Sequence, residues 1–440
     1  MKSVVIIAPD FTPSSMPPAL RVRFFAEHLP EYGWQPTVIS TDPAFYENPV
    51  DWENEKLLSG RYEVIRTPAL AAKTTRKFGV GDLGLRSLWH QWKALAELCR
   101  KGKVDLVFIP VPPNYSMALG RLAHRRFGVP YVIDYIDPYI TNYYKTVPRG
   151  QRPPKWRLAH AVAHLVEPFS VRYAGHLVGV DASYTAGVVS RYPWFADDDA
   201  TGIPYGGERG DFEYLRDHPR QNRIFDKNDG FIHISYVGRG GPDMLPALRT
   251  LFAAVRQGMA QEPDIFSRLR MHFVGTDYAP PEAVRYQVLP LAREMGLEQI
   301  VAEHPSRVAY LDALQTLLDS QMLVVVGSTE AHYTASKIFP YILADRPLLG
   351  IFHEDSSAVR ILRETAAGEV VTFNRESPVE NKIPEVLATL RRLLTNLGQP
   401  RSVCWQAFEP YTTHALTARL AQAFETAIAK SKNGRDWAAP

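Results

Sequence analysis

Short apolar runs, each followed by a longer amphipathic stretch, recur along the whole chain and constrain its fold more than any other feature. The runs are four to six residues long and almost entirely apolar, as are strands that helices cover on both faces of a parallel sheet. In the first half they cover residues 4–8, 36–40, 64–67, 105–110, 131–135 and 176–180. In the second half they cover residues 233–237, 271–274, 308–311, 322–326, 348–352 and 369–373.

The stretches between these runs have the period of amphipathic helices. They include residues 20–32, 87–100, 117–127, 245–257, 283–295, 311–320 and 357–364. Strand alternating with helix over many repeats predicts an α/β fold with doubly wound parallel sheets.

The length of the chain and its pattern of strands and helices predict more than one domain. Its 440 residues exceed one ordinary core, and the alternation restarts at Ile232 after the polar stretch 208–230, which we interpret as a linker. We therefore predict Rossmann-like domains over 1–215 and 216–403. Residues 404–430 are expected to form helices that pack back on the N-terminal domain, and residues 431–440 to be a frayed tail. Ligands bind outside the carboxyl ends of parallel strands, so the cleft between the domains is the expected site.

Composition excludes several classes of protein. A hydrophobic content of 45% and a charged content of 22% are typical of a soluble globular protein, and a net charge of +3 does not favour nucleic-acid binding. The two cysteines, Cys99 and Cys404, lie far apart and match no metal-ligand spacing. A disulfide framework is therefore not expected, which favours a reducing cytoplasm. The first apolar run is too short for a signal peptide, and no window is apolar enough for a membrane span.

Ten short motifs occur in a characteristic order. They are Ile6-Ile7-Ala8-Pro9, Pro17-Pro18-Ala19-Leu20-Arg21, Tyr32-Gly33-Trp34, Asp105-Leu106-Val107, Gly128-Val129-Pro130-Tyr131-Val132-Ile133-Asp134, Asp137-Pro138, Ile203-Pro204-Tyr205-Gly206-Gly207, Tyr236-Val237-Gly238-Arg239, Ser336-Lys337-Ile338-Phe339-Pro340-Tyr341 and Arg346-Pro347-Leu348-Leu349. Their order and spacing resemble those of retaining glycosyltransferases of family 4, over nearly the whole chain.

The resemblance implies a GT-B architecture, in which two Rossmann-like domains face each other across a cleft. It implies a hexosyltransferase that moves a sugar from a nucleotide-sugar donor to a glycan or lipid-linked acceptor, with retention of configuration. The donor would bind the second domain and the acceptor the first, without a metal ion or other cofactor. Such an enzyme of glycan biosynthesis would be cytoplasmic, with peripheral contact to the inner face of the membrane as a further expectation.

Arg239 is the first candidate for donor binding. It lies in the glycine-rich turn 238–243 directly after a predicted strand. Gly238 and Gly240 would let the backbone approach a diphosphate, which an arginine can bind bidentately. The alternative is an ordinary tight turn with a solvated arginine.

Lys337 is the second candidate. It follows the predicted strand 322–326 and a polar loop, and it opens a predicted helix with Ser336 or Thr334 as N-cap. A lysine at a helix N-terminus suits a diphosphate; the alternative is a capped surface helix.

The same loop holds Glu330 and His332, which are candidates for contact with the donor sugar or ribose. The family pattern has two glutamates at the positions that are His332 and Pro340 here, and proline offers no side-chain acceptor. This departure motivates one alternative, a GT-B-like binding or scaffold protein without catalysis. A sugar-nucleotide epimerase is the other alternative.

Asp134 and Asp137 stand at the end of the predicted strand 131–135, where charged groups are costly unless they are paired or used. Asp137 could orient or deprotonate an acceptor hydroxyl, and its alternative role is to cap a turn before Pro138. Arg21, at the start of the first helix, would face either the phosphates or solvent.

Basic residues and tryptophans gather in two places in the first domain. They are Lys73, Arg76, Lys77, Arg86, Trp89, Trp92, Lys93, Arg100, Lys101 and Lys103, and then Lys145, Arg149, Arg152, Lys155, Trp156 and Arg157. Such mixtures are typical of helices that bind anionic lipid, and also of solvated helix faces with tryptophans in the core.

Overall fold

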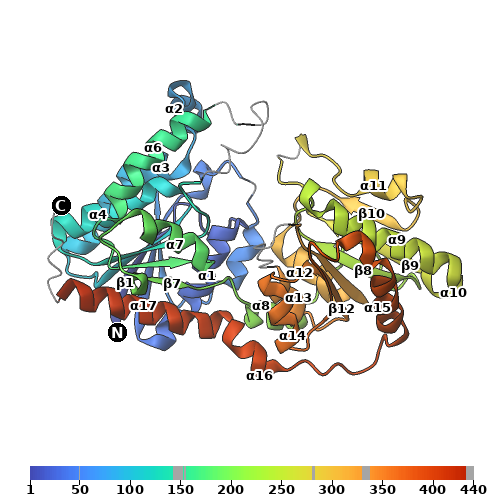
Figure 1. Cartoon of the computed structure of the whole chain (residues 1–440). Helices are drawn as coiled ribbons and strands as arrows, with labels where there is room; N and C mark the ends of the chain where they lie inside the picture. Colours follow the sequence, from blue (N-terminus) through green and yellow to red (C-terminus); the bar gives the residue numbers. More distant parts are fainter. Residues whose placement is uncertain (49, 142–151, 153–154, 280–282, 330–336, 433–440) are drawn as a thin grey trace. The chain divides into compact units, whose positions relative to one another are not determined.

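The computed structural model describes residues 1–48, 50–141, 152, 155–279, 283–329 and 337–432 (Figure 1). They form two compact units. The first comprises Met1–Tyr205 together with the chain from Thr413 onward, and the second comprises Gly206–Thr412.

The first unit is built on a seven-stranded sheet in the order β3-β2-β1-β4-β5-β6-β7, and all of its pairs are parallel. The strands are β1 Lys2–Ile7, β2 Trp34–Thr41, β3 Glu63–Thr67, β4 Leu106–Val111, β5 Tyr131–Tyr135, β6 His176–Gly179 and β7 Ala200–Gly202. The helices are α1 Pro17–His28, α2 Ala72–Thr75, α3 Leu83–Arg100, α4 Met117–Phe127, α6 Trp156–Val171, α7 Ala182–Arg191 and α17 Thr413–Lys432.

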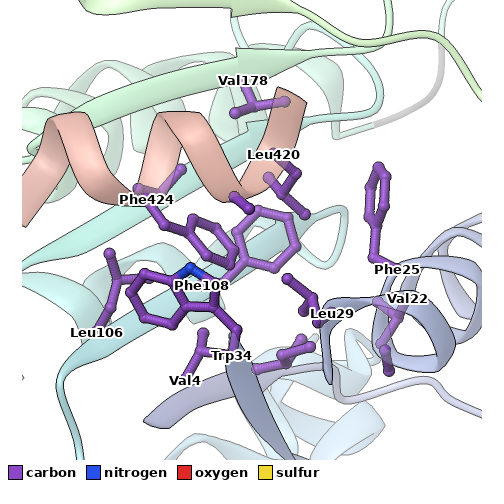
Figure 2. Packing of buried hydrophobic residues seen from close by; sticks show 14 of the residues in the cluster. Val4, Val22, Phe25, Leu29, Trp34, Leu106, Phe108, Val178, Leu420 and Phe424 are labelled. Atoms are coloured by element: carbon purple, nitrogen blue, oxygen red, sulfur yellow. The ribbon is translucent and has the colours of Figure 1, made fainter. Parts of the chain in front are cut away.

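Helix α17 completes the core of the first unit, although it is the last helix of the chain. Figure 2 shows Leu420 and Phe424 of this helix among side chains from β1, β2 and β4. The ring of Phe424 lies 5.1 Å from that of Trp34 and 5.2 Å from that of Phe108, with edge-to-face geometry in both pairs. Such packing explains why this segment belongs to the first unit.

The second unit has a six-stranded parallel sheet in the order β10-β9-β8-β11-β12-β13. The strands are β8 Ile232–Val237, β9 Leu269–Val274, β10 Val301–His304, β11 Met322–Val326, β12 Leu348–His353 and β13 Glu369–Phe373. The helices are α8 Arg209–Asp217, α9 Leu245–Gln261, α10 Pro263–Phe266, α11 Leu289–Glu294, α12 Tyr310–Asp319, α13 Ile338–Leu343, α14 Ser357–Glu364, α15 Ile383–Thr395 and α16 Trp405–Phe408.

The predicted fold class, two doubly wound parallel α/β domains, is confirmed. The units meet at residues 205/206 and 412/413, whereas the predictions were 215/216 and 403/404. Part of the stretch interpreted as a linker is helix α8, which buries Phe212 and Leu215. The hydroxyl of Tyr310 in α12 donates to Asp211 of this helix at 2.6 Å, so α8 belongs to the second unit.

One predicted strand, residues 308–311, is wrong. Tyr310 begins helix α12, and the strand in this region is β10, which alternates between buried and half-buried residues and includes Glu303. A strand that contains a carboxylate does not form a continuous apolar run, so the apolar pattern does not predict it. The short edge strand β7 was missed because its three residues are only half-buried. Within the described residues, no helix is long and apolar enough to cross a membrane.

Candidate functional site

The turn after β8 is the part of the second unit where the predicted site residues meet. Gly238 has φ +151°, and a Cβ atom there would lie 2.6 Å from Nζ of Lys337. A side chain at this position would therefore displace the lysine. The glycine lets the amine of Lys337, which precedes α13, lie directly against the backbone at the end of β8.

Tyr236 holds this arrangement together. Nζ of Lys337 donates to its hydroxyl at 2.6 Å and lies 4.6 Å from the centre of its ring. The same hydroxyl donates to the carbonyl of Arg239 at 2.6 Å. One buried phenol thus joins the amine of Lys337 to the backbone of Arg239. This role was not predicted, because a tyrosine inside an apolar strand is typical of the core.

Burial, together with the charge of the neighbouring Arg239, lowers the pKa of the Lys337 amine to about 7, while Asp243 acts in the opposite direction. An incoming anion would raise this pKa again. The lysine can therefore take up a proton when a negatively charged group binds beside it.

Arg239 itself is held by Asp243. Its two terminal nitrogens donate to the two carboxylate oxygens at 3.0 and 2.8 Å. Burial acts to raise the pKa of Asp243, but the hydrogen bonds and charge of Arg239, with a hydrogen bond from Ser328, outweigh burial and lower it. Both side chains are about one-third exposed, so the guanidinium can exchange its partner for another anion.

Gly240 has a packing role in the same turn. Its N–H donates to the carbonyl of Thr276 at 2.8 Å, and a Cβ atom there would lie 2.9 Å from Cβ of Gln287. Behind it, the buried carboxylate of Glu303 accepts the N–H groups of Gln287, Val288 and Leu289 at 2.7–2.9 Å and a hydrogen bond from the Thr276 hydroxyl. This carboxylate fixes the wall against which the turn packs.

Helix α13 is hydrogen-bonded to β8 through Tyr341, which was not among the residues predicted from the sequence. The hydroxyl of Tyr341 accepts the N–H of Val237 at 2.6 Å and contacts its carbonyl at 3.1 Å. Pro340 lies beside it in α13 and offers no acceptor. Glu330, His332 and Ser336 lie outside the described residues, so their proposed contacts stay predictions.

In the first unit, the carboxyl end of β5 carries a buried ion pair. Arg21 of α1 donates to both oxygens of Asp134 at 2.6 and 3.0 Å, with the side chains only 1% and 0% exposed. Its remaining hydrogen bonds reach the carbonyls of Ile203 and Pro204 at 2.8 and 3.1 Å. The guanidinium thus faces neither solvent nor an open site, and the geometry gives both residues a structural role in joining α1, β5 and the segment after β7.

Asp137 differs from Asp134 because it is exposed at the turn after β5. Partial burial of the carboxyl nevertheless raises its pKa above the ordinary value. Burial raises the pKa of Tyr184 and of Tyr205, and the negative charge of Asp137 raises both pKa values as well. Within the described residues, the Tyr205 hydroxyl has no hydrogen-bond partner. A carboxylate and two phenols therefore gather at this strand end.

Asp10 is a further carboxyl group near the carboxyl ends of the strands in this sheet, and it was not among the residues predicted from the sequence. It lies three residues after the end of β1, and burial raises the pKa of its carboxyl to about 6, against the opposing hydrogen bond from Ser14. The available signal was similar to that used for Asp134, an aspartate close to the carboxyl end of a buried strand.

Comparison with known proteins agrees with this architecture. Residues 18–206, most of the first unit, match the glycosyl transferase 4-like domain. Solved structures extend the likeness to both units, and a protein from Anabaena, HepE, in complex with UDP and glucose is similar at a TM-score of 0.58. That likeness has 13% identity and covers 97% of this chain and 100% of HepE. The fold is GT-B.

Two further solved structures have the same fold. A glycosyltransferase from Rickettsia africae is 14% identical with a TM-score of 0.56, over 97% of this chain and 98% of its own. WaaG, a glycosyltransferase involved in lipopolysaccharide biosynthesis, is 13% identical with a TM-score of 0.52, over 95% and 98%. No curated protein sequence matches this chain.

Proposed function

We propose that this GT-B protein is a glycosyltransferase that moves a hexosyl group from a nucleotide sugar to a glycan or lipid-linked acceptor. The observation that carries the proposal is the arrangement around Tyr236, where Lys337 and Arg239 meet beside Gly238. Two cationic side chains beside a glycine-rich turn suit the diphosphate of a sugar nucleotide.

Lys337 and Arg239 would act on the leaving group. As the bond between sugar and diphosphate breaks, negative charge builds on the diphosphate, and Arg239 would exchange Asp243 for it. Protonated Lys337 would add a second cation. With this charge supplied by side chains, we propose that transfer needs no metal ion and that a chelator leaves activity unchanged.

The acceptor would be handled by the first unit. Asp137 has an exposed carboxylate with a raised pKa, so it can accept or orient a proton of a hydroxyl group. Arg21 and Asp134 would position the strand end without touching the substrate. Retention of configuration, location in the cytoplasm and a role in glycan biosynthesis rest on the family resemblance.

Uridine nucleotides are the first donors to test. The solved HepE structures contain UDP, UDP-glucose, or UDP with glucose, and their fold is that of this chain. That likeness reaches this protein only as a proposal, because 12–13% identity supports the fold alone.

The experiment measures thermal stabilisation by UDP, GDP and ADP, followed by turnover of the corresponding sugar nucleotides. Stabilisation should disappear in Lys337→Ala and weaken strongly in Arg239→Ala. Arg249→Ala is the matched control, because Arg249 also forms a bidentate pair in the second unit, with Glu294 at 2.7 and 3.1 Å. It should leave stabilisation unchanged.

The outcomes separate the alternatives. Absence of stabilisation by every nucleotide would refute donor binding. Nucleotide binding without slow donor hydrolysis or transfer would favour a scaffold protein, the alternative suggested by the missing glutamates. Conversion of the free sugar nucleotide into an epimer, without acceptor, would favour an epimerase.

A further inference from the structure

Helix α6 of the first unit exposes an apolar stripe. Leu158, Leu165 and Phe169 are 64%, 73% and 42% exposed, and Ala161 is exposed as well. Spacings of three, four and seven residues place these side chains on one face of a helix. The opposite face buries Ala163, Glu167 and Ser170 against the unit, so the stripe is not needed for its core.

Basic side chains surround the stripe. Arg121 of α4 lies 5.0 Å from the ring of Phe169, and Arg152 and Arg157 lie 5.3 and 5.8 Å from the ring of Trp156. Lys155 is exposed at the start of the helix. These cations rim the stripe near both of its ends.

Acidic residues are absent from the same stretch of sequence. Residues 138–166 contain no Asp or Glu. The next carboxylate, Glu167, is buried and paired with Arg191 at 3.0 Å, so it does not neutralise the rim. A second exposed apolar group lies nearby: Phe78, 83% exposed, precedes Gly79, where an added Cβ atom would lie 3.1 Å from Nζ of Lys155.

Helix α3, which carries much of the other basic cluster, lacks these features. Arg86 is buried and donates to the carbonyls of Leu70 and Phe45 at 2.9 and 3.0 Å. Trp92 packs on Phe127 at 6.2 Å. Trp89 and Lys93 remain exposed, but Glu97 follows one turn later. Helix α3 therefore exposes one tryptophan close to an acidic residue, rather than an apolar stripe like that of α6.

We infer that α6 docks on an anionic lipid bilayer, lying in the plane of the interface. Leucine and phenylalanine would enter the boundary of the acyl chains, and the long stems of the surrounding arginines and lysine would reach the phosphate groups. A rim of one sign favours a uniformly anionic surface. This inference does not depend on the proposed enzymatic activity.

The apolar part is tested with vesicles of phosphatidylcholine containing about 30% phosphatidylglycerol, using flotation of the full chain. Leu158→Asn with Leu165→Asn removes apolar surface without changing charge and should lower the partition coefficient roughly tenfold or more. The control is Ala159→Asn, an exposed change on the same helix beside the stripe, which should bind as the wild type does.

The charge is tested separately. Lys155→Gln with Arg157→Gln should lower partition roughly tenfold, and vesicles of phosphatidylcholine alone should bind weakly. The matched control, Arg216→Gln with Arg256→Gln, removes two exposed charges from the second unit and should have no effect. Wild-type binding should also weaken when salt is raised.

Three results would overturn the inference. The first is no flotation of the wild-type protein, and the second is an equal loss of vesicle binding in the control variants. The third is a dimer in analytical ultracentrifugation that the leucine substitutions dissociate while flotation is unaltered. The last result would assign the stripe to a second copy of the chain. Circular dichroism of each variant verifies that the exposed substitutions leave the fold intact.

Discussion

The two sheets each bring an arginine and an aspartate together beyond the end of a strand, but they bury them to opposite extents. In the first unit, Arg21 and Asp134 are 1% and 0% exposed. In the second, Arg239 and Asp243 are 33% and 29% exposed. Both pairs are bidentate, with distances of 2.6–3.0 Å and 2.8–3.0 Å.

The difference in burial decides what each pair can do. A buried charge that loses its partner has neither water nor another ion, so a buried pair cannot open to receive a ligand at small cost. A partly exposed pair is worth little by itself and can exchange one partner for a ligand. The first pair is therefore costly to break and has a structural role, whereas the second is available for binding.

The largest effect is expected from breaking the buried pair. Arg21→Ala leaves Asp134 buried without its cation and should lower the free energy of unfolding by about 3–5 kcal/mol. Asp243→Ala, which breaks the exposed pair, should change it by about 0–1 kcal/mol. Urea denaturation of both variants measures the contrast.

The double variant Arg21→Met/Asp134→Leu sharpens the result, since it removes both charges and fills similar space. It should recover much of the stability lost by Arg21→Ala. Similar losses for Arg21→Ala and Asp243→Ala would show that burial does not distinguish the two pairs.

A second contrast lies within the first unit, between the locked Asp134 and the two carboxyl groups with raised pKa. If Asp137 handles the acceptor proton, Asp137→Asn should lower kcat about a hundredfold and leave nucleotide affinity unchanged. The measurement is steady-state transfer together with the thermal shift caused by the nucleotide.

Asp10→Asn is the companion variant, because the pKa of Asp10 is raised to about 6. A base must be deprotonated to act, so a rate that depends on Asp10 falls as pH drops below about 6. If Asp10→Asn lowers kcat about a hundredfold, Asp137→Asn keeps full activity and the wild-type rate falls below about pH 6, the role belongs to Asp10.

The fold was largely predictable because most residues of most strands are apolar. Strands Tyr131–Tyr135, Met322–Val326 and Glu369–Phe373 have the predicted bounds. Strand β10 was not found because Glu303 interrupts it. Its carboxylate is stabilised there by backbone N–H groups of residues 287–289 and by the Thr276 hydroxyl. Such partners come from the tertiary structure and leave no local pattern.

The candidate site was predictable only in part, because some of its contacts leave a pattern in the sequence and others do not. The motifs placed Arg239 in the turn after one strand and Lys337 at the start of the helix that follows another. These two strands proved to be neighbours in the sheet. The linking role of Tyr236 could not be predicted, since a hydroxyl inside a strand is visible only when its partners are known. Nor could the burial of Arg21, which depends on carbonyls more than 180 residues away.

The smallest predicted effect concerns Lys337. Because burial shifts the pKa of this lysine, its binding of an anion should depend on pH. Since burial lowers the pKa of the free lysine to about 7 and a bound diphosphate would raise it, binding above pH 7 must take up a proton. Affinity for the nucleotide diphosphate should be flat below pH 7 and fall by up to about tenfold per pH unit above it, until the pKa of the complex is reached. Calorimetry in two buffers of different ionisation enthalpy measures this proton uptake. Lys337→Arg keeps a cation that does not titrate in this range, so its affinity should lose the dependence on pH; if the dependence persists there, it belongs to another group.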